Sequence, residues 1–221
     1  DLPSKLTATG VGRGYRADEA AEQTPPPRKE VQLRAPLFEQ GEKKLTPAEV
    51  GTAHHLFMQF CDFDAACAPN GVENELNRLA EKKILSTEQA YAVDKRKIER
   101  FFASDLYKTF MAENKVRREF KFSVLVPVQA YFPVAADAPE ENVLLQGVID
   151  CLIETGDGFV ILDFKTDRIK KGGAVERAEQ YRPQLAAYAR AVHEIYGRPV
   201  RACVLYFFHT GDTEWVSLDE T

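Results

Sequence analysis

The sequence predicts a mixed α/β fold in which a helical first half precedes a β-rich second half. Apolar residues recur at helical spacing between residues 46 and 118, and strict alternation of apolar and polar residues follows over residues 118–128. Two apolar runs come next, at residues 145–154 and 159–166, with Gly156-Asp157-Gly158 as the turn between them. The predicted order is therefore helices, three strands, a helix and two strands.

The composition fits one folded domain and excludes a broadly basic surface. The chain has 221 residues, of which 44% are hydrophobic and 29% charged, and its formal net charge is −5. Such a chain can bury a full core, but it does not attract nucleic acid by its overall charge. A DNA-binding surface must be a local basic patch. The candidates are Arg168, Lys170 and Lys171; Lys115, Arg117 and Arg118; and Lys95, Arg96, Lys97 and Arg100. The alternative for each is a solvated face, which we favour for residues 95–100.

Several site classes are excluded by what the sequence lacks. The four cysteines are scattered and contain no Cys-x-x-Cys pair, so neither a zinc ribbon nor an iron–sulfur cluster is supported. The phosphate-binding pattern Gly-x-x-x-x-Gly-Lys-Ser/Thr is absent, so we expect no ATP site in this chain. No signal peptide or membrane span is visible, which predicts a cytoplasmic location and no membrane partner. Because the chain starts at Asp1 without Met, we expect it to be a piece of a longer protein.

Residues 1–45 are predicted to be a linker or arm. Gly10, Gly12 and Gly14 interrupt one helical pattern, and Pro25-Pro26-Pro27 ends a second, Ala- and Glu-rich pattern at residues 16–23. A helix begins at Thr46, where Thr46, Pro47 and Glu49 form a capping-box pattern. Residues 73–85, 86–102 and 104–114 read as further helices that serve as scaffold.

His55 lies opposite the apolar stripe of the first helix, whereas His54 lies at its flank. His55 therefore faces water or a polar cleft. Two adjacent histidines cannot bind one metal from the same helix face, so the helix offers one candidate ligand. The alternative is that His55 is simply solvent-exposed.

The β-rich half is predicted to hold strands at residues 118–128, 145–154, 159–166, 200–208 and 213–218. A loop is expected at residues 137–142 and a basic, glycine-containing loop at 168–177. Pro183 opens a helix that runs to Tyr196 and ends at Gly197.

Charged residues break the apolar pattern of the central strands. Asp163 and Lys165 share a strand face, and Asp150 lies on the preceding strand. If the two strands pair, both carboxylates converge beside the lysine. This arrangement suits a divalent cation and leaves the lysine to meet a phosphate or a water. The alternative is a solvated Asp and a surface ion pair.

Five short motifs occur in a fixed order. They are Gly51-Thr-Ala-His-His55, Arg118-Glu119 followed by Phe120, Gln146-Gly-Val-Ile-Asp150, Asp163-Phe-Lys165, and Tyr181-Arg-Pro-Gln184-Leu-Ala-Ala-Tyr188. Together they resemble the RecB-type nuclease domains of the PD-(D/E)XK superfamily, in particular the C-terminal nuclease domains of AddA proteins from bacterial AddAB helicase-nucleases. Residues 5–45 match least.

The resemblance implies a restriction-endonuclease-like core over residues 46–221, with a central mixed β-sheet flanked by helices. It implies metal ligation by His55, Asp150, Asp163 and the backbone carbonyl of Phe164. The metal would be Mg²⁺, with Mn²⁺ as a substitute. The implied catalytic residues are Asp150, Asp163, Lys165, Gln184 and Tyr188, with Glu119 and Gln146 in supporting positions. We expect Arg168, Lys170 and Lys171 to contact DNA, because they directly follow the Asp-x-Lys strand.

The implied activity is exonucleolytic hydrolysis of single DNA strands produced by a helicase motor, in double-strand break repair and recombination, with an AddB-type partner. One alternative is a catalytically silent scaffold of the nuclease fold, although no site residue is missing. The other is a free-standing RecB-like exonuclease, a class that usually carries a cysteine-held cluster.

Overall fold

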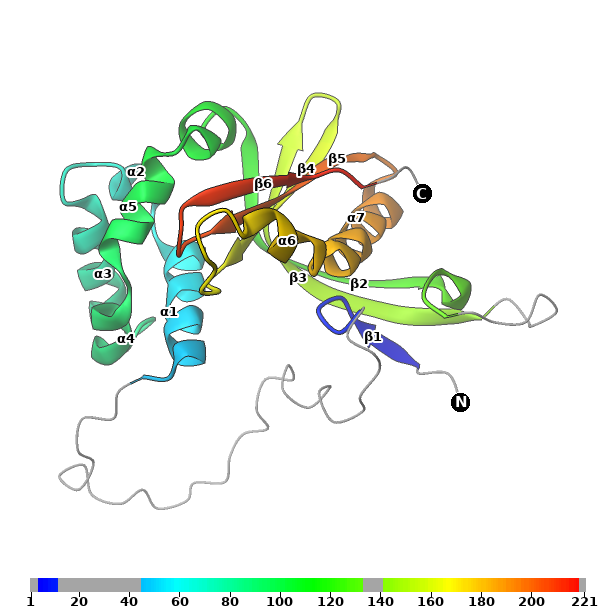
Figure 1. The fold of residues 1–221 in the computed structure, drawn as a ribbon, viewed down its shortest axis with the longest axis horizontal. Coiled ribbons are helices and arrows are strands. Elements are labelled where there is room, and N and C mark those ends of the chain that lie inside the picture. The colour runs from blue at the N-terminus through cyan, green and yellow to red at the C-terminus, as the bar shows by residue number, and fades with distance from the viewer. Residues whose placement is uncertain (1–3, 12–44, 133–140, 219–221) are drawn as a thin grey trace, which may run out of the picture.

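The structure is a computed structural model that describes residues 4–11, 45–132 and 141–218. Its elements are β1 (Lys5–Thr7), α1 (Pro47–Phe60), α2 (Phe63–Ala66), α3 (Gly71–Glu81), α4 (Thr87–Ala92), α5 (Lys95–Ala103), the π-helical turn η3 (Leu106–Met111), β2 (Lys115–Pro127), the 3-10 turn η4 (Val128–Ala130), β3 (Asn142–Thr155), β4 (Gly158–Lys165), α6 (Ala174–Glu179), α7 (Arg182–Tyr196), β5 (Val200–Phe207) and β6 (Asp212–Val216). The predicted mixed α/β fold, with a central mixed sheet flanked by helices, is confirmed (Figure 1).

The six-stranded sheet is built around β3, which has neighbours on both edges. The strand β2 pairs antiparallel with β3 from Asn142 to Glu154. On the other edge, β1 pairs in parallel with residues 144–146 and β4 pairs antiparallel with residues 151–155. Residues 147–150 therefore lie where this edge of β3 changes partner. Asp150 is the last of these four residues, so its side chain lies at a break in this edge of the sheet, between the segment paired with β1 and the segment paired with β4.

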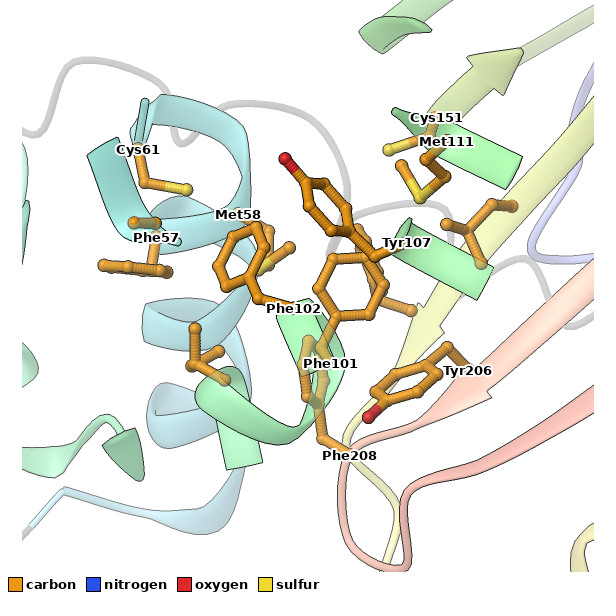
Figure 2. Close-up of a cluster of buried hydrophobic side chains, with 14 of the residues drawn as sticks. Phe57, Met58, Cys61, Phe101, Phe102, Tyr107, Met111, Cys151, Tyr206 and Phe208 are labelled. Atoms are coloured by element: carbon orange, nitrogen blue, oxygen red, sulfur yellow. The ribbon is translucent and has the colours of Figure 1, made fainter. Parts of the chain in front are cut away.

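The helices cover both faces of the sheet (Figure 1). Alternate residues of β4 enter different cores, because successive strand side chains point to opposite faces. Val160, Leu162 and Phe164 pack with the helical block α1–α5, whereas Phe159 and Ile161 pack with α6 and α7. Figure 2 shows the first core around Phe101. The Phe101 ring meets the rings of Phe164 and Tyr206 edge to face, with ring centroids 5.2 and 4.9 Å apart.

Both predicted capping boxes are present. The Thr46 side chain accepts from the Glu49 amide and Glu49 reaches back to Thr46, and Ser86 and Gln89 form the same reciprocal pair at α4. The single predicted helix over residues 86–102 is wrong: α4 ends at Ala92 and α5 begins at Lys95. The chain is extended at Val93, and the Asp94 N–H donates to His54 Nε2, 3.3 Å away, instead of continuing a helix.

Two short elements depart from the sequence predictions. Lys5–Thr7 forms a strand although the segment was expected to be a linker, because β3 supplies hydrogen-bond partners that the local sequence does not reveal. The predicted loop at residues 168–177 is wrong in its second part, where α6 begins at Ala174. The predicted helical pattern at residues 16–23 lies outside the described residues, as do residues 137–140 of the predicted loop. The domain boundary at residue 46 stays a prediction. Among the described residues, no helix is long and apolar enough to cross a membrane.

Candidate active site

His55 is carried to the sheet by α1, which approaches the end of β4 closely. A Cβ at Gly51 would lie 2.8 Å from Thr166 Oγ1, so only glycine allows this approach without a shift. One turn later, His55 Nδ1 lies 3.4 Å from Asp150 Oδ1. Burial disfavours the charged imidazole, but the hydrogen bond and the attraction of Asp150 outweigh it, so the pKa of His55 lies above its ordinary value. The prediction that His55 faces a polar cleft is confirmed.

The neighbouring His54 is buried, with 3% of its surface exposed. Its Nδ1 lies 2.9 Å from Val50 O, and its Nε2 accepts from the Asp94 amide. Burial lowers the pKa of His54, which fits a neutral ring that donates at Nδ1 and accepts at Nε2. His54 therefore joins α1 to the start of α5 and does not enter the site.

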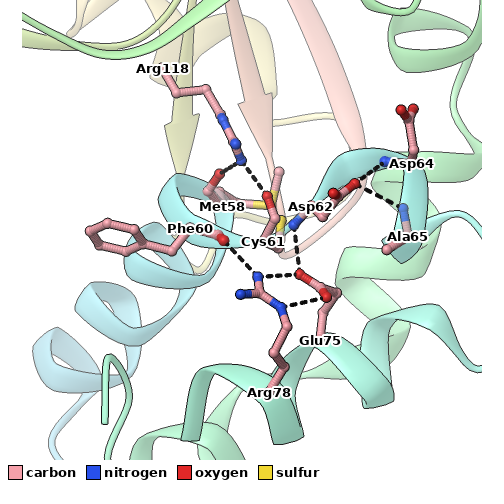
Figure 3. A network of polar contacts seen from close by, with 9 residues as sticks. All are labelled: Met58, Phe60, Cys61, Asp62, Asp64, Ala65, Glu75, Arg78 and Arg118. Atoms are coloured by element: carbon pink, nitrogen blue, oxygen red, sulfur yellow. Dashed lines mark hydrogen bonds and ion pairs between the residues drawn. The ribbon is translucent and has the colours of Figure 1, made fainter. Parts of the chain in front are cut away.

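The C-terminal end of α1 is fixed by an arginine from the sheet (Figure 3). Arg118 of β2 donates from Nη1 to the carbonyl oxygens of Met58, at 3.0 Å, and Cys61, at 2.6 Å. These carbonyls have no partner within the helix, and a cation at a helix C-terminus also meets the negative end of its dipole. Arg118 thus belongs to a structural contact that holds α1 over the sheet.

A buried glutamate connects α3 to the same region (Figure 3). Glu75 Oε2 accepts from the Asp62 amide at 2.6 Å, and Arg78 donates to both oxygens of Glu75. Arg78 also donates to Phe60 O at 2.9 Å. The hydrogen bonds from Arg78 outweigh burial and hold the pKa of Glu75 below its ordinary value. The carboxylate therefore links α3 to the loop that follows α1.

We expect Glu75→Gln to lower the stability of the protein by about 1–3 kcal/mol at neutral pH, because the charged hydrogen bonds are lost. A carboxyl group with a lowered pKa in the folded state stabilises the fold above its unfolded-state pKa, and that contribution disappears as the pH falls through the folded-state value. The difference in melting temperature between the two proteins should thus shrink below the ordinary range of glutamate. Glu73→Gln, at an exposed position on the same helix, is the control. A constant difference down to the lowest pH would contradict the assignment.

Asp150 and Asp163 lie directly beyond the last backbone pair of β3 and β4, which joins Cys151 and Leu162. Asp150 Oδ2 accepts from the Phe164 amide at 2.7 Å. Asp163 is buried, with 3% exposed, and burial raises its pKa, as does the nearby charge of Asp150, although the charge of Lys165 opposes both. The predicted convergence of these two carboxylates with Lys165 is confirmed.

Lys165 lies on the α7 side of the sheet among polar partners. Its Nζ is 2.5 Å from Asp163 Oδ2 and 3.3 Å from Gln184 Oε1. The Asp163 contact lacks hydrogen-bond geometry, so this buried oxygen has a charged neighbour but no donor. Gln184 Nε2 in turn donates to Tyr188 Oη at 2.7 Å. Burial raises the pKa of Tyr188 strongly, so the phenol stays neutral. Lys165, Gln184 and Tyr188 thus form one chain of contacts.

Glu119 faces Asp150 from β2, in the register between Arg118 and Phe120. Its φ of 51° is left-handed, which is uncommon for a residue with a side chain. Burial raises the pKa of Glu119, and the negative charge of Asp150 adds to this. A small surface pocket is lined by His55, Met58, Gln59, Glu119, Asp150 and Phe164.

The remaining predicted residues are Gln146 and the basic residues after β4. Gln146 donates to Ser123 Oγ at 2.8 Å. It stands four residues along β3 from Asp150, about 13 Å at the usual strand rise. Arg168, Lys170 and Lys171 are exposed in the segment after β4. Their predicted roles stay predictions.

The sequence patterns gave no role to Asp167, Arg177 and Tyr181, which contact one another and bring the Tyr181 ring to Lys165. Lys165 Nζ lies 3.8 Å from the centroid of the Tyr181 ring. Tyr181 begins the Tyr181–Tyr188 motif, but only the fold brings it over the lysine. Asp167 follows Lys165 by two positions, a spacing that could have signalled a shared environment.

The donors present are chemically suited to a divalent cation. Two carboxylates and an imidazole match the preferences of Mg²⁺ and Mn²⁺. The raised pKa values of Glu119 and Asp163, due first to burial and also to the neighbouring negative charge, mark a place where a cation would be stabilised. Within the described ranges, no group of three or more His, Cys, Asp or Glu side chains already has the geometry to hold a metal. In this structure Asp163 forms an ion pair with Lys165 and does not share a ligand position with two or more of the other donors.

A comparison with protein families matches residues 28–217 to the model of the PD-(D/E)XK nuclease superfamily. The matched range takes in every helix and strand from α1 to β6 and leaves out only β1 among the described elements. All the residues that surround Asp150, Asp163 and Lys165 therefore lie within the match.

Comparison with curated proteins gives a consistent result. The chain is 40% identical over 213 residues to the A subunit of the ATP-dependent helicase/nuclease of Moorella thermoacetica, a match that spans 95% of this chain. It is 41% identical over 176 residues to the corresponding protein of Desulforamulus reducens, spanning 80% of this chain, and 34% identical over 212 residues to that of Thermoanaerobacter pseudethanolicus, spanning 96%. The matched regions make up 15%, 14% and 17% of those relatives. The chain therefore corresponds to a small part of each.

Proposed function

This chain belongs to the PD-(D/E)XK nuclease superfamily, and from that premise we propose that it is the metal-dependent DNA nuclease domain of an AddA-type helicase-nuclease. The observation that carries the proposal is the pairing of Asp163 with Lys165 on β4, opposite Asp150 at the break in the edge of β3. His55 of α1 meets Asp150 from the other side. A charged lysine beside buried carboxylates suits hydrolysis of a phosphodiester.

In this proposal His55, Asp150, Asp163 and the Phe164 carbonyl hold the cation, which is Mg²⁺ or, as a substitute, Mn²⁺. Such an ion polarises a phosphate and lowers the pKa of a bound water. Asp150 already orients one oxygen toward the Phe164 amide, which leaves its other oxygen beside His55. The contact between Asp163 and Lys165 must loosen for Asp163 to act as a ligand.

Lys165 has two roles open to it. As an ammonium, it orients the attacking water, or it neutralises charge on the phosphorane. Gln184 fixes the ammonium through Oε1, and Tyr188 holds Gln184 in turn. Because Tyr188 is neutral, it contributes as a hydrogen-bonding group and not as a base. Glu119 lies beside Asp150 in the pocket and adds negative charge that a bound cation would offset.

The finer assignment is drawn from the relatives. We propose that the domain acts as an exonuclease on single strands delivered by a helicase motor, in repair and recombination of DNA breaks. The relatives are each one component of a helicase/nuclease with more than one kind of chain, which supports a partner protein that we take to be of the AddB type. Action on DNA in a bacterial cell supports a cytoplasmic location.

The test is a cleavage assay with end-labelled linear single-stranded DNA and the same sequence as a closed circle. We expect cleavage of the linear DNA with Mg²⁺ or Mn²⁺, none with EDTA, and little cleavage of the circle. Cleavage in EDTA would contradict metal dependence, and equal cleavage of the circle would contradict an exonuclease. No cleavage under any condition would favour a silent scaffold.

The exposed residues Arg168, Lys170 and Lys171 are proposed to hold the DNA strand, since the net charge of −5 provides no long-range attraction. Replacing all three with Ala should raise KM for single-stranded DNA by about 10-fold or more, lower kcat less, and flatten the dependence of binding on salt. Kinetics and binding at several salt concentrations measure this. Lys95, Lys97 and Arg100 of α5, replaced together, are the control. An unchanged KM and salt slope would exclude the 168–171 segment as the DNA contact.

A further inference from the structure

We infer that Tyr181 is a positioning residue for Lys165, and that Asp167 and Arg177 hold its ring in place. The first observation is the contact itself. Lys165 Nζ lies 3.8 Å from the ring centroid of Tyr181, well within the range of a cation–π interaction. The lysine side chain is 12% exposed, so the ammonium is largely shielded from water, which strengthens its attraction to the ring.

The partners of Lys165 restrain its ammonium from three sides. Asp163 and Gln184 contact it from the strand and from α7, and the face of Tyr181 covers a further side. An ammonium group has three N–H bonds and can rotate among acceptors. A ring face limits that rotation without adding a charge, and it therefore keeps the amine directed at the carboxylate side of the site.

Tyr181 is itself held by a carboxylate and an arginine. Its hydroxyl donates to Asp167 Oδ2. Arg177 Nη2 donates to Asp167 Oδ1 at 3.1 Å and to the Tyr181 hydroxyl oxygen at 3.4 Å. The three residues come from three places in the chain, namely the segment after β4, α6 and the residue before α7. Their contacts tie the helices α6 and α7 to the strand that carries Lys165.

The protonation states favour this arrangement. Burial opposes the charge on Asp167, but the hydrogen bonds from Tyr181 and Arg177 prevail and lower its pKa. Burial and the hydrogen bond to Asp167 both raise the pKa of Tyr181, so the phenol keeps its proton. A neutral phenol that donates to a carboxylate has a more electron-rich ring, which a lysine ammonium prefers.

This inference rests on the proposed nuclease function for its kinetic consequence, but its structural core can be tested without activity. The variants are Tyr181→Leu, which removes the ring, and Tyr181→Phe, which keeps the ring and removes the hydroxyl. Tyr91→Leu, at a position that is 93% exposed, is the control for the loss of a tyrosine. Melting curves establish that each variant folds.

The first measurement is the NMR signal of the Lys165 ε-methylene group in protein labelled with ¹³C at lysine Cε, assigned with a Lys165→Arg variant. The ring current of Tyr181 should displace this signal upfield of the other lysines. The displacement should vanish in Tyr181→Leu, shrink in Tyr181→Phe because the hydroxyl contacts to Asp167 and Arg177 are lost, and remain unchanged in Tyr91→Leu. A signal that does not change in folded Tyr181→Leu would overturn the inference.

The second measurement is DNA cleavage. Tyr181→Leu should lower kcat by about 10- to 100-fold with KM within a factor of about two, because a misplaced catalytic group slows the chemical step more than it weakens binding. Tyr181→Phe should restore part of kcat, because it keeps the ring but loses the hydroxyl contacts to Asp167 and Arg177. A loss confined to KM, or no rescue by Phe, would contradict positioning. If the unsubstituted protein does not cleave DNA, the proposed function fails, and the lysine signal alone then decides the inference.

Discussion

Asp163→Asn and Lys165→Met are each expected to lower kcat for DNA cleavage by about 1,000-fold or more, because a site that stabilises charge in the transition state loses a charged group. Asp163→Asn keeps the shape of the side chain and removes its negative charge. Lys165→Met keeps much of the length and removes the ammonium. The measurement is single-turnover cleavage of end-labelled single-stranded DNA with Mg²⁺.

The design of these variants follows from burial. Asp163 is 3% exposed and Lys165 is its charged neighbour, so truncation to Ala would leave a cavity or an unpaired buried charge. The sequence left open a solvated Asp and a surface ion pair, but the structure shows that both side chains are largely enclosed. Asp157→Asn, at the exposed turn of the same hairpin, is the matched control. A folded Asp163→Asn protein that cleaves at the unsubstituted rate would refute the site.

Substitutions of the two adjacent histidines are expected to have different effects, on metal binding for His55 and on stability for His54. His55→Ala should weaken binding of Mn²⁺ by about 100-fold and lower cleavage similarly, since removal of groups that only support metal ligands already costs about 10- to 100-fold. The melting temperature should change little, because the side chain is 35% exposed. Calorimetric titration with Mn²⁺ measures the affinity. Equal metal affinity in His55→Ala and in the unsubstituted protein would remove His55 from the ligand set.

His54→Ala should instead destabilise the fold by about 2 kcal/mol while leaving metal affinity unchanged in the folded fraction. The buried ring bridges Val50 O and the Asp94 amide and packs 5.8 Å from the Phe208 ring. The helical wheel placed His54 only at the flank of the apolar stripe, whereas the structure places it in a hydrogen-bonded contact between α1 and the start of α5. Chemical denaturation of both variants separates the two histidines.

Local patterns determined much of the fold. The capping boxes at Thr46 and Ser86 depend on residues three positions apart, and both are present. The hairpin of β3 and β4 follows from two apolar runs and a glycine turn, and its pairing runs up to Cys151 and Leu162, the neighbours of Asp150 and Asp163. The two-residue period of a strand placed Lys165 beside Asp163. Each of these features is encoded within a few neighbouring residues, which is why the sequence sufficed.

Only the tertiary structure decided which distant segments meet. The strand β1 pairs with β3 across more than a hundred residues, and this pairing leaves Asp150 at a break in the sheet edge. Gly51 lets α1 approach Thr166 and brings His55 to Asp150. Tyr181 reaches Lys165 because α6 and α7 fold back onto β4. Such contacts arise from the packing of whole elements and have no period or spacing along the chain, so the sequence supplied the chemical groups and the fold supplied their neighbours.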